Sequence, residues 1–147
     1  MQMTDADGKQ QTGLLPDAST DWPRLLYQVP LPGALVRLAR RLVAAFREHY
    51  PNSEILFANK SNNGLAIRHI MNQEGAGGDC FGNTEMYLAL LAGTEPKSLV
   101  LNGSNKEDEE LEMAIVNGLC INIDAMDELD RIDAVSKRLG KNVDIGI

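Results

Sequence analysis

The sequence predicts an α/β protein, and more specifically an incomplete (β/α)8 TIM-type barrel with about five parallel strands. Short apolar runs alternate with amphipathic helical segments, and the starts of successive runs lie 23, 21, 20 and 24 residues apart. Such alternation predicts parallel strands joined by right-handed crossovers. Most of the runs are apolar at successive positions, as expected for strands in a sheet covered by helices.

An open doubly wound sheet is the alternative architecture with this repeat. No G-x-G-x-x-G motif follows a predicted strand, so nothing favours a dinucleotide site of that fold. The even spacing of the units favours the barrel instead. A closed barrel needs about 250 residues, whereas this chain has 147, and we therefore expect only part of one.

The N-terminal elements are less regular than the rest. Residues 1–22 are polar and lack apolar periodicity, which predicts a disordered tail. Residues 23–147 are expected to form the barrel portion. A short strand could occupy residues 24–29. The first helix is predicted over residues 33–49, where apolar residues recur at helical spacing, and Pro51 follows it.

Five strands and four further helices follow. The predicted strands are residues 55–58, 78–81, 99–101, 119–123 and 143–147, and the helices between them are residues 65–73, 84–91, 108–116 and 126–139. A glycine closes several units and suits a left-handed helix C-cap: Gly75, Gly93, Gly118 and Gly140.

Composition excludes several classes of function. Hydrophobic residues make up 44% of the chain, which is enough for a core, and the net charge of -7 argues against binding to nucleic acid or to an anionic membrane. No apolar run approaches the roughly 20 residues that span a bilayer. The polar N-terminus has no hydrophobic signal segment, and a cytoplasmic location is expected.

The cysteines and histidines do not suggest a metal site. Cys80 and Cys120 lie 40 residues apart in apolar stretches and lack the paired spacing of zinc ligands. We expect both to be reduced, buried thiols. His49 and His69 are isolated on predicted helices, and no metal role is assigned to them.

Polar residues gather where the predicted strands end, the edge at which parallel α/β folds carry their reactive groups. Lys60 follows an apolar strand, and its amine is a potential nucleophile towards an aldehyde. A solvated loop lysine is the alternative interpretation. Asp79 and Glu85 are its natural partners, although a turn-capping acid and an acid in a first helical turn are alternatives for them.

The remaining acidic runs indicate ordinary helix starts. Residues 107–110 read EDEE at the beginning of a predicted helix, where acidic side chains complement the helix dipole. Asp127, Glu128 and Asp130 are interpreted in the same way, as solvated residues.

Three blocks of sequence resemble the alanine-racemase-type (fold type III) pyridoxal-phosphate decarboxylases, which include the diaminopimelate, ornithine and arginine decarboxylases. Residues 57–62 read FANKSN, similar to the family pattern [YF]-A-x-K-[AC]-N. Residues 77–85 read GGDCFGNTE, similar to G-x-D-x-x-S-x-x-E. Residues 100–111 read VLNGSNKEDEEL, similar to [VI]-x-N-G-x-x-K-x-x-x-E-L. Ser61 replaces the usual Ala or Cys, and Gly82 replaces a common Ser.

The resemblance implies a role for each candidate residue. Lys60 would hold pyridoxal 5′-phosphate as a Schiff base, and Asp79 and Glu85 would lie beside the cofactor. The expected reaction is decarboxylation of a small basic or diamino amino acid, of the diaminopimelate, ornithine, arginine or lysine type. Enzymes of this kind act as dimers, so a homodimer through the full-length fold is expected.

The resemblance covers only the N-terminal barrel part of such enzymes, so we expect a truncated chain. In the family, the phosphate-binding loop, the acid at the pyridine nitrogen and a C-terminal β-domain lie beyond the position of Ile147. Weak cofactor binding and no turnover are therefore expected of this chain alone. An inactive fragment, a regulatory partner of a decarboxylase and a racemase of the same fold remain alternatives.

Overall fold

The computed structural model describes residues 3–4, 10–11 and 33–147. Strands β1 (Met3–Thr4) and β2 (Gln10–Gln11) pair in antiparallel fashion. They fall within the predicted tail, most of which lies outside the described residues. The possible strand at residues 24–29 also lies outside them. Residues 33–147 form a separate unit and contain all the other elements.

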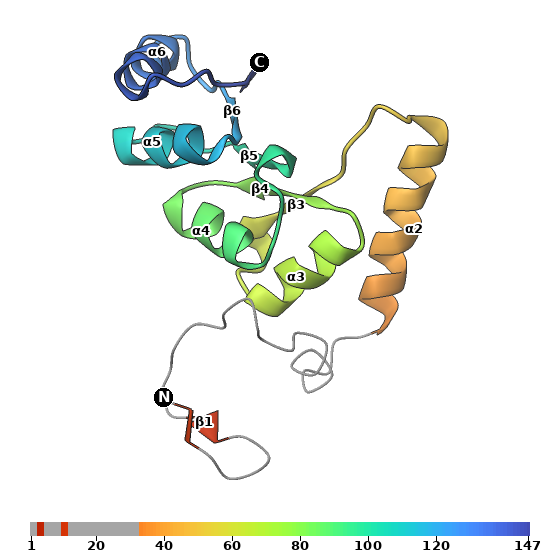
Figure 1. The fold of residues 1–147 in the computed structure, drawn as a ribbon. Coiled ribbons are helices and arrows are strands. Elements are labelled where there is room, and N and C mark those ends of the chain that lie inside the picture. Colours follow the sequence, from red (N-terminus) through yellow and green to blue (C-terminus); the bar gives the residue numbers. More distant parts are fainter. Residues whose placement is uncertain (1–2, 5–9, 12–32) are drawn as a thin grey trace. The chain divides into compact units, whose positions relative to one another are not determined.

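The five predicted strands are all present and form one parallel sheet (Figure 1). They are β3 (Leu56–Ala58), β4 (Gly77–Cys80), β5 (Leu99–Leu101), β6 (Cys120–Asn122) and β7 (Ile145–Gly146). Each boundary lies within two residues of the predicted one. The order in the sheet is β3-β4-β5-β6-β7.

The helices also lie where the apolar spacing predicts them. They are α2 (Gly33–His49), α3 (Leu65–Gln73), α4 (Asn83–Leu91), α5 (Asp108–Asn117) and α6 (Glu128–Leu139). Two short 3-10 turns, η1 (Asn59–Ser61) and η2 (Pro96–Ser98), flank the strands. The four predicted terminating glycines all have positive φ, and Gly118 and Gly140 are left-handed C-caps, where a side chain would be strained.

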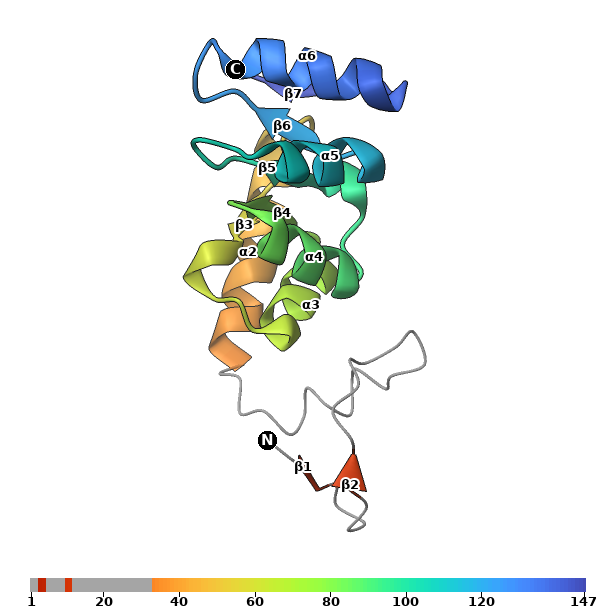
Figure 2. The same cartoon turned by 90° about the vertical axis from the view of Figure 1, so that its left-hand side faces the viewer.

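The strand order places the helices that connect the strands on one face. Each strand pairs with its neighbour in sequence, and right-handed crossovers that always advance in one direction put every helix on the same side. A doubly wound sheet reverses its order and is covered on both faces. In Figures 1 and 2, helices α3 to α6 follow one another along one side of the strands. The fold is therefore a partial TIM-type barrel, as predicted.

The core lies between that face of the sheet and the helices. Its largest buried members come from β4, β5, α4, α5, β6, α6 and the position just before β6: Cys80, Met86, Leu99, Leu101, Leu111, Ile115, Leu119, Ile121, Ile132 and Val135. The opposite face is less covered. Ala58, Asp79, Val100 and Cys120 stand side by side in the parallel register and are each only half-buried.

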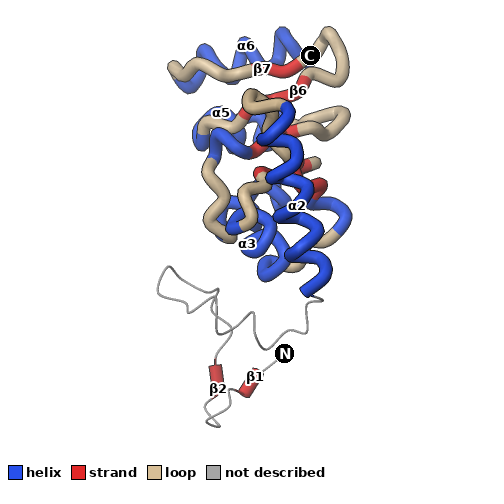
Figure 3. The backbone as a smooth tube through the Cα atoms, turned by 90° about the vertical axis from the view of Figure 1, so that its right-hand side faces the viewer, coloured by secondary structure: helices blue, strands red, loops and turns tan. Residues whose placement is uncertain are grey.

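Helix α2 precedes the sheet and packs beside α3 (Figure 3). The Arg40 guanidinium donates two hydrogen bonds to the Glu74 carboxylate, at 2.6 and 2.7 Å. Ala39 and Val43 are buried, whereas Leu38 and Leu42 are exposed. Among the residues that the structure describes, no helix combines the length and apolarity needed to cross a membrane.

Candidate functional site

The carboxyl edge of the sheet brings the predicted site residues into one region. Lys60 lies in η1, two residues after β3 ends, rather than on the strand itself. Asp79 lies in β4 and pairs in register with Ala58. Because parallel strands end at the same edge, the segments that carry these residues are neighbours. Lys60 is exposed.

Asn59 fixes the turn that carries Lys60. Its side chain is buried, at 2% exposure, and its Nδ2 donates to Cys80 Sγ at 3.2 Å. A side chain at Gly78 would come within 2.8 Å of that amide nitrogen. The bare backbone of β4 therefore leaves room for Asn59, and Asn59 anchors η1 to the neighbouring strand.

Ser61, which replaces the usual Ala or Cys of the family pattern, stabilises the turn that carries Lys60. The Ser61 hydroxyl donates a hydrogen bond of 2.7 Å to the Ala58 carbonyl oxygen and closes the turn on itself. The second substitution, Gly82, lies against α5, because a side chain there would come within 2.7 Å of Glu110 Oε1.

The Lys60 amine meets an aromatic ring from the end of the next strand. Lys60 Nζ lies 5.5 Å from the centre of the Phe81 ring, within the range of a cation–π contact. Phe81 is 48% exposed, so both partners face solvent. Among the described residues, no ion pair joins Lys60 to Asp79 or to Glu85.

Glu85 lies in the first turn of α4, as its pattern indicates. Its Oε2 accepts a hydrogen bond of 2.8 Å from the Phe81 backbone N–H, which ties the helix start to the end of β4. The backbone carbonyl oxygen of the same residue accepts a hydrogen bond of 2.6 Å from Arg68 Nη1. Glu85 thus supports the segment that carries Phe81.

The ends of β5 and β6 add amide groups to the same edge. Asn122 Nδ2 donates to Asn102 Oδ1 at 3.2 Å. A side chain at Gly103 would collide with the Phe81 carbonyl oxygen, so the segments that follow β4 and β5 are in direct contact. Amide and carboxylate side chains thus occur at successive strand ends next to the segment of Lys60.

A buried ion pair joins the segment after β5 to the start of α6. Lys106 Nζ donates to Glu128 Oε2 at 2.8 Å, and the Asp124 backbone N–H donates to the same oxygen at 3.0 Å. The prediction that Glu128 is solvated is wrong, because only 4% of it is exposed. Its sequence position, in a first helical turn, resembles those of its acidic neighbours. The counter-ion 22 residues away decides its burial.

The charge of Lys106 governs the titration of Glu128. Burial by itself raises the pKa of a carboxyl group. Here the hydrogen bond and charge of Lys106, together with the Asp124 N–H, outweigh burial, and the pKa of Glu128 is lowered. Glu128 Oε1 is buried and has no hydrogen-bond partner among the described residues.

The two cysteines are free thiols with different surroundings. Cys80 is fully buried, as predicted, and burial raises the pKa of its thiol to about 11, although the Asn59 amide opposes part of that shift. Cys120 is only half-buried, which corrects the prediction for that residue, and burial also raises its pKa. The described residues contain no group of three or more His, Cys, Asp or Glu side chains placed to hold a metal ion.

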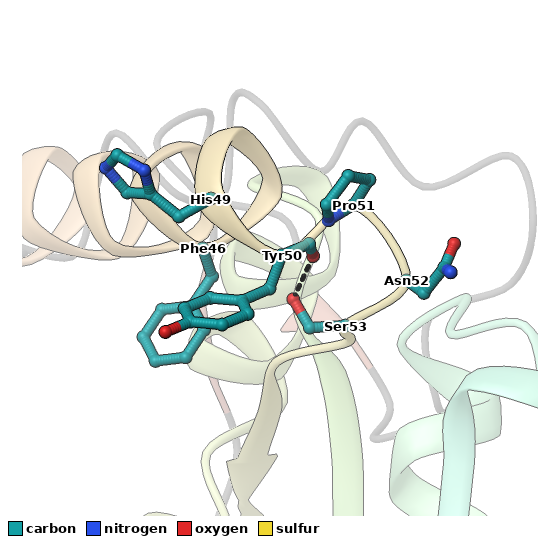
Figure 4. Close-up of a pocket in the computed structure, with 6 residues that line it drawn as sticks. All are labelled: Phe46, His49, Tyr50, Pro51, Asn52 and Ser53. Carbon is teal, nitrogen blue, oxygen red and sulfur yellow. Dashed lines mark hydrogen bonds between the residues drawn. The ribbon is translucent and has the colours of Figure 1, made fainter.

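A separate pocket of about 670 Å³ lies at the end of α2 (Figure 4). It is lined by residues from the end of α2 and the turn after it, among them Phe46, His49 and Tyr50. The Phe46 and Tyr50 ring centres lie 6.2 Å apart, and the Ser53 hydroxyl donates to the Tyr50 carbonyl oxygen at 2.6 Å. The pocket precedes β3, whereas Lys60 follows it, so the two lie at opposite ends of the strand.

Comparison with known proteins identifies a family over most of the chain. Residues 36–147 match the model described as "Pyridoxal-dependent decarboxylase, pyridoxal binding domain". A diaminopimelate decarboxylase of Archaeoglobus fulgidus is 37% identical over 108 residues, which cover 74% of this chain and 26% of that enzyme. A second one, from Methanothermobacter thermautotrophicus, is 36% identical over 97 residues, or 66% of this chain and 23% of that enzyme.

A solved structure agrees with these relatives. The diaminopimelate decarboxylase of M. jannaschii in co-complex with L-lysine superposes with a TM-score of 0.71 and 28% identity, over 76% of this chain and 27% of that one. The chain therefore spans about a quarter of the length of the relatives it matches.

Proposed function

Because the chain belongs to the pyridoxal-dependent decarboxylases through their pyridoxal-binding domain, we propose that it binds pyridoxal 5′-phosphate through Lys60 and forms the cofactor-binding part of a decarboxylase of a basic or diamino amino acid. The observation that carries this proposal is that Lys60 is exposed at the carboxyl edge of the sheet, next to Asn59, whose buried side chain fixes the turn.

The residues around Lys60 fit the aldehyde end of this cofactor. A primary amine that is open to solvent can attack an aldehyde carbon. The carbon–nitrogen bond then forms, and the carbonyl oxygen leaves as one molecule of water, which gives a Schiff base. Among the described residues, the Lys60 amine contacts the Phe81 ring and forms no ion pair, so its nitrogen lone pair can react once the amine loses its proton.

The other site residues would act on the bound group and on its orientation. Asp79 lies in the row of half-buried residues on the face that the crossover helices leave open, next in register to Ala58, and its carboxylate can accept hydrogen bonds there. Glu85 holds the backbone of Phe81 and so fixes the neighbouring strand end. When bound, pyridoxal phosphate supplies an electron sink for the electrons left by the departing carboxylate.

A basic or diamino substrate is supported by the relatives. The two sequence relatives described above are named diaminopimelate decarboxylases, and one solved relative is described in complex with L-lysine. We propose the same substrate class for this protein, a small amino acid that carries a second amino group.

A homodimer is also proposed. Strands β3 and β7 are the two ends of the sheet order and each has one unpaired edge among the described residues. Open strand edges favour pairing with another chain. Light scattering on the purified chain should give a mass above that of the 16.1 kDa monomer, and a monodisperse monomer would count against assembly.

The cofactor proposal is tested by trapping the linkage. The purified chain is incubated with pyridoxal phosphate, reduced with borohydride, digested and analysed by mass spectrometry. We expect one phosphopyridoxyl group on Lys60 and none in the Lys60→Arg variant. Lys97→Arg, which alters another exposed lysine, should leave the label unchanged. Labelling of Lys97, Lys137 and Lys141 to the same extent as Lys60 would indicate an unspecific reaction and would overturn the proposal. That result is the one expected if the chain is a non-catalytic partner.

A further inference from the structure

We propose that Arg68 is a positioning residue that holds Lys60 in place for its reaction with the cofactor, an inference that rests on the proposed function. Arg68 lies in α3, and its hydrogen bonds go to Asn63 and Glu85 and not to Lys60 itself. Its effect on Lys60 would pass through two neighbouring segments, one on each side of the amine.

Arg68 is an unusually buried cation. Only 2% of the residue is exposed, and Nε is buried with no hydrogen-bond partner among the described residues. Burial lowers the pKa of Arg68, yet an arginine keeps its charge near neutral pH. A buried charge without a carboxylate in direct contact costs free energy. An apolar side chain at this position of α3 would avoid that cost in free energy. The hydrogen bonds that the guanidinium makes therefore indicate its role.

The first segment that Arg68 holds is the loop that carries Lys60. Arg68 Nη2 donates to Asn63 Oδ1 at 2.5 Å, and Asn63 is three residues beyond Lys60. Asn59, buried against Cys80, fixes the other side of Lys60. The short segment from Asn59 to Asn63 is therefore anchored at both ends.

The second segment is the one that carries Phe81. Arg68 Nη1 donates to the Glu85 carbonyl oxygen at 2.6 Å. The carboxylate of Glu85 in turn accepts from the Phe81 N–H, and the Phe81 ring lies beside the Lys60 amine. Both sets of contacts from the guanidinium thus lead to Lys60, one through the backbone and one through the ring.

The fork of the guanidinium is what allows one side chain to hold both segments. Its two terminal nitrogens point in fixed, separate directions, whereas a lysine offers a single nitrogen. Arg68→Lys preserves the charge but should lose one of the two contacts. The loop would then sample more conformations, and the amine would spend less time in the reactive position.

The test compares the rate of Lys60 modification with the affinity for the cofactor. Wild type, Arg68→Lys and Asn63→Ala are each reacted with increasing pyridoxal phosphate and trapped with borohydride. We expect the rate constant at saturation to fall at least fivefold in both variants, with little change in the half-saturating concentration. A general loss of structure would change both quantities together and would lower the Tm.

Asn63→Ala and one further variant make the result decisive. Asn63 is exposed, so Asn63→Ala removes one contact without leaving a new buried cavity, and the variant should fold even if Arg68 variants do not. Arg47→Met is the matched control, because Arg47 is an exposed arginine of α2 whose contact is the Gly75 carbonyl oxygen. It should label Lys60 at the wild-type rate.

Hydrogen exchange measured without cofactor separates this inference from the proposed function. The backbone amides of residues 60–64 should exchange faster in Arg68→Lys and Asn63→Ala than in wild type. If wild type is not labelled at Lys60, the proposed function fails and this inference with it. If wild type is labelled and both variants match its rate and its exchange, only the role of Arg68 is overturned.

Discussion

Lys60 Nζ lies 5.5 Å from the centre of the Phe81 ring, so residues that follow two adjacent strands meet over the open end of the sheet. Lys60 follows β3 and Phe81 follows β4. The contact is exposed, and exposed cation–π contacts contribute only about 0.5–1 kcal/mol. Phe81 therefore orients the amine without trapping it, which is compatible with the proposed reaction of Lys60 with an aldehyde.

Replacement of Phe81 should have a modest effect. We expect Phe81→Leu to change the rate of Lys60 labelling by less than about fivefold, since about 1 kcal/mol corresponds to that factor. Borohydride trapping and mass spectrometry measure it. A complete loss of label, as expected for Lys60→Arg, would mean that the ring takes part in cofactor binding itself.

Removal of one partner of the buried ion pair should destabilise the chain strongly. Lys106→Met leaves the Glu128 carboxylate buried without its counter-ion, at a cost of about 3–5 kcal/mol. Urea unfolding followed by circular dichroism measures the loss. The matched control is Arg138→Met, which removes an exposed ion pair with Glu112 and should cost less than about 1 kcal/mol. Equal losses in both variants would contradict the special role of burial.

The same pair gives stability a defined pH dependence. The pKa of Glu128 is lowered in the folded state, so the folded protein binds its proton less readily than the unfolded chain does. The stabilisation is therefore complete above the unfolded pKa of about 4.3 and is lost as the pH falls through the lower, folded value. Urea midpoints measured from pH 6 to pH 3 should fall less steeply for Glu128→Gln than for wild type. A parallel decline in both proteins would show that other groups dominate.

The two thiols should differ in reactivity. With a pKa of about 11, Cys80 is only about 0.1% thiolate at pH 8, and the thiolate is the reactive form. Burial also keeps the reagent away from it. We expect a disulfide reagent to modify Cys120 first and Cys80 only on unfolding. In the Cys80→Ala variant, the rapid modification assigned to Cys120 should persist. Loss of that rapid reaction would show that Cys80 is the more reactive thiol.

The chain of 147 residues should release no CO₂ from amino acids by itself. Its sheet has five parallel strands where a closed barrel has eight, so the side of the sheet that carries Asp79 stays open to water. Decarboxylation by the cofactor depends on a site that holds it in a fixed orientation. Release of labelled CO₂ from diaminopimelate, dependent on Lys60 and above the level of free pyridoxal phosphate, would contradict this expectation.

Periodicity was sufficient to predict the elements of the fold. Helix α3 matches its predicted range because apolar residues recur at helical spacing between two turns. Gly118 marks the end of α5 because only glycine adopts its backbone conformation without strain. Both signals are local, and they are read from a few adjacent residues.

The side chains that support the site could not be predicted in the same way. Glu128 and Asp130 look alike in the sequence, since both lie in the first turn of one helix. Only the position of Lys106, supplied by the preceding unit, makes Glu128 a buried residue. Arg68 is buried in α3, and no local pattern marks it, because its two acceptors come from different segments.

The sequential order of the strands also determines how the chain can fold while it is being made. Each strand of the sheet after β3 pairs with the one synthesised before it, and at about 5–20 residues per second a ribosome delivers the next unit within a few seconds. Helix α3 and β4 can dock on β3 before β5 exists, and none of the pairings among the described strands of this sheet waits for a partner encoded far downstream. Lys60 precedes most of these units, so each successive strand adds its polar end to an edge that already carries this lysine.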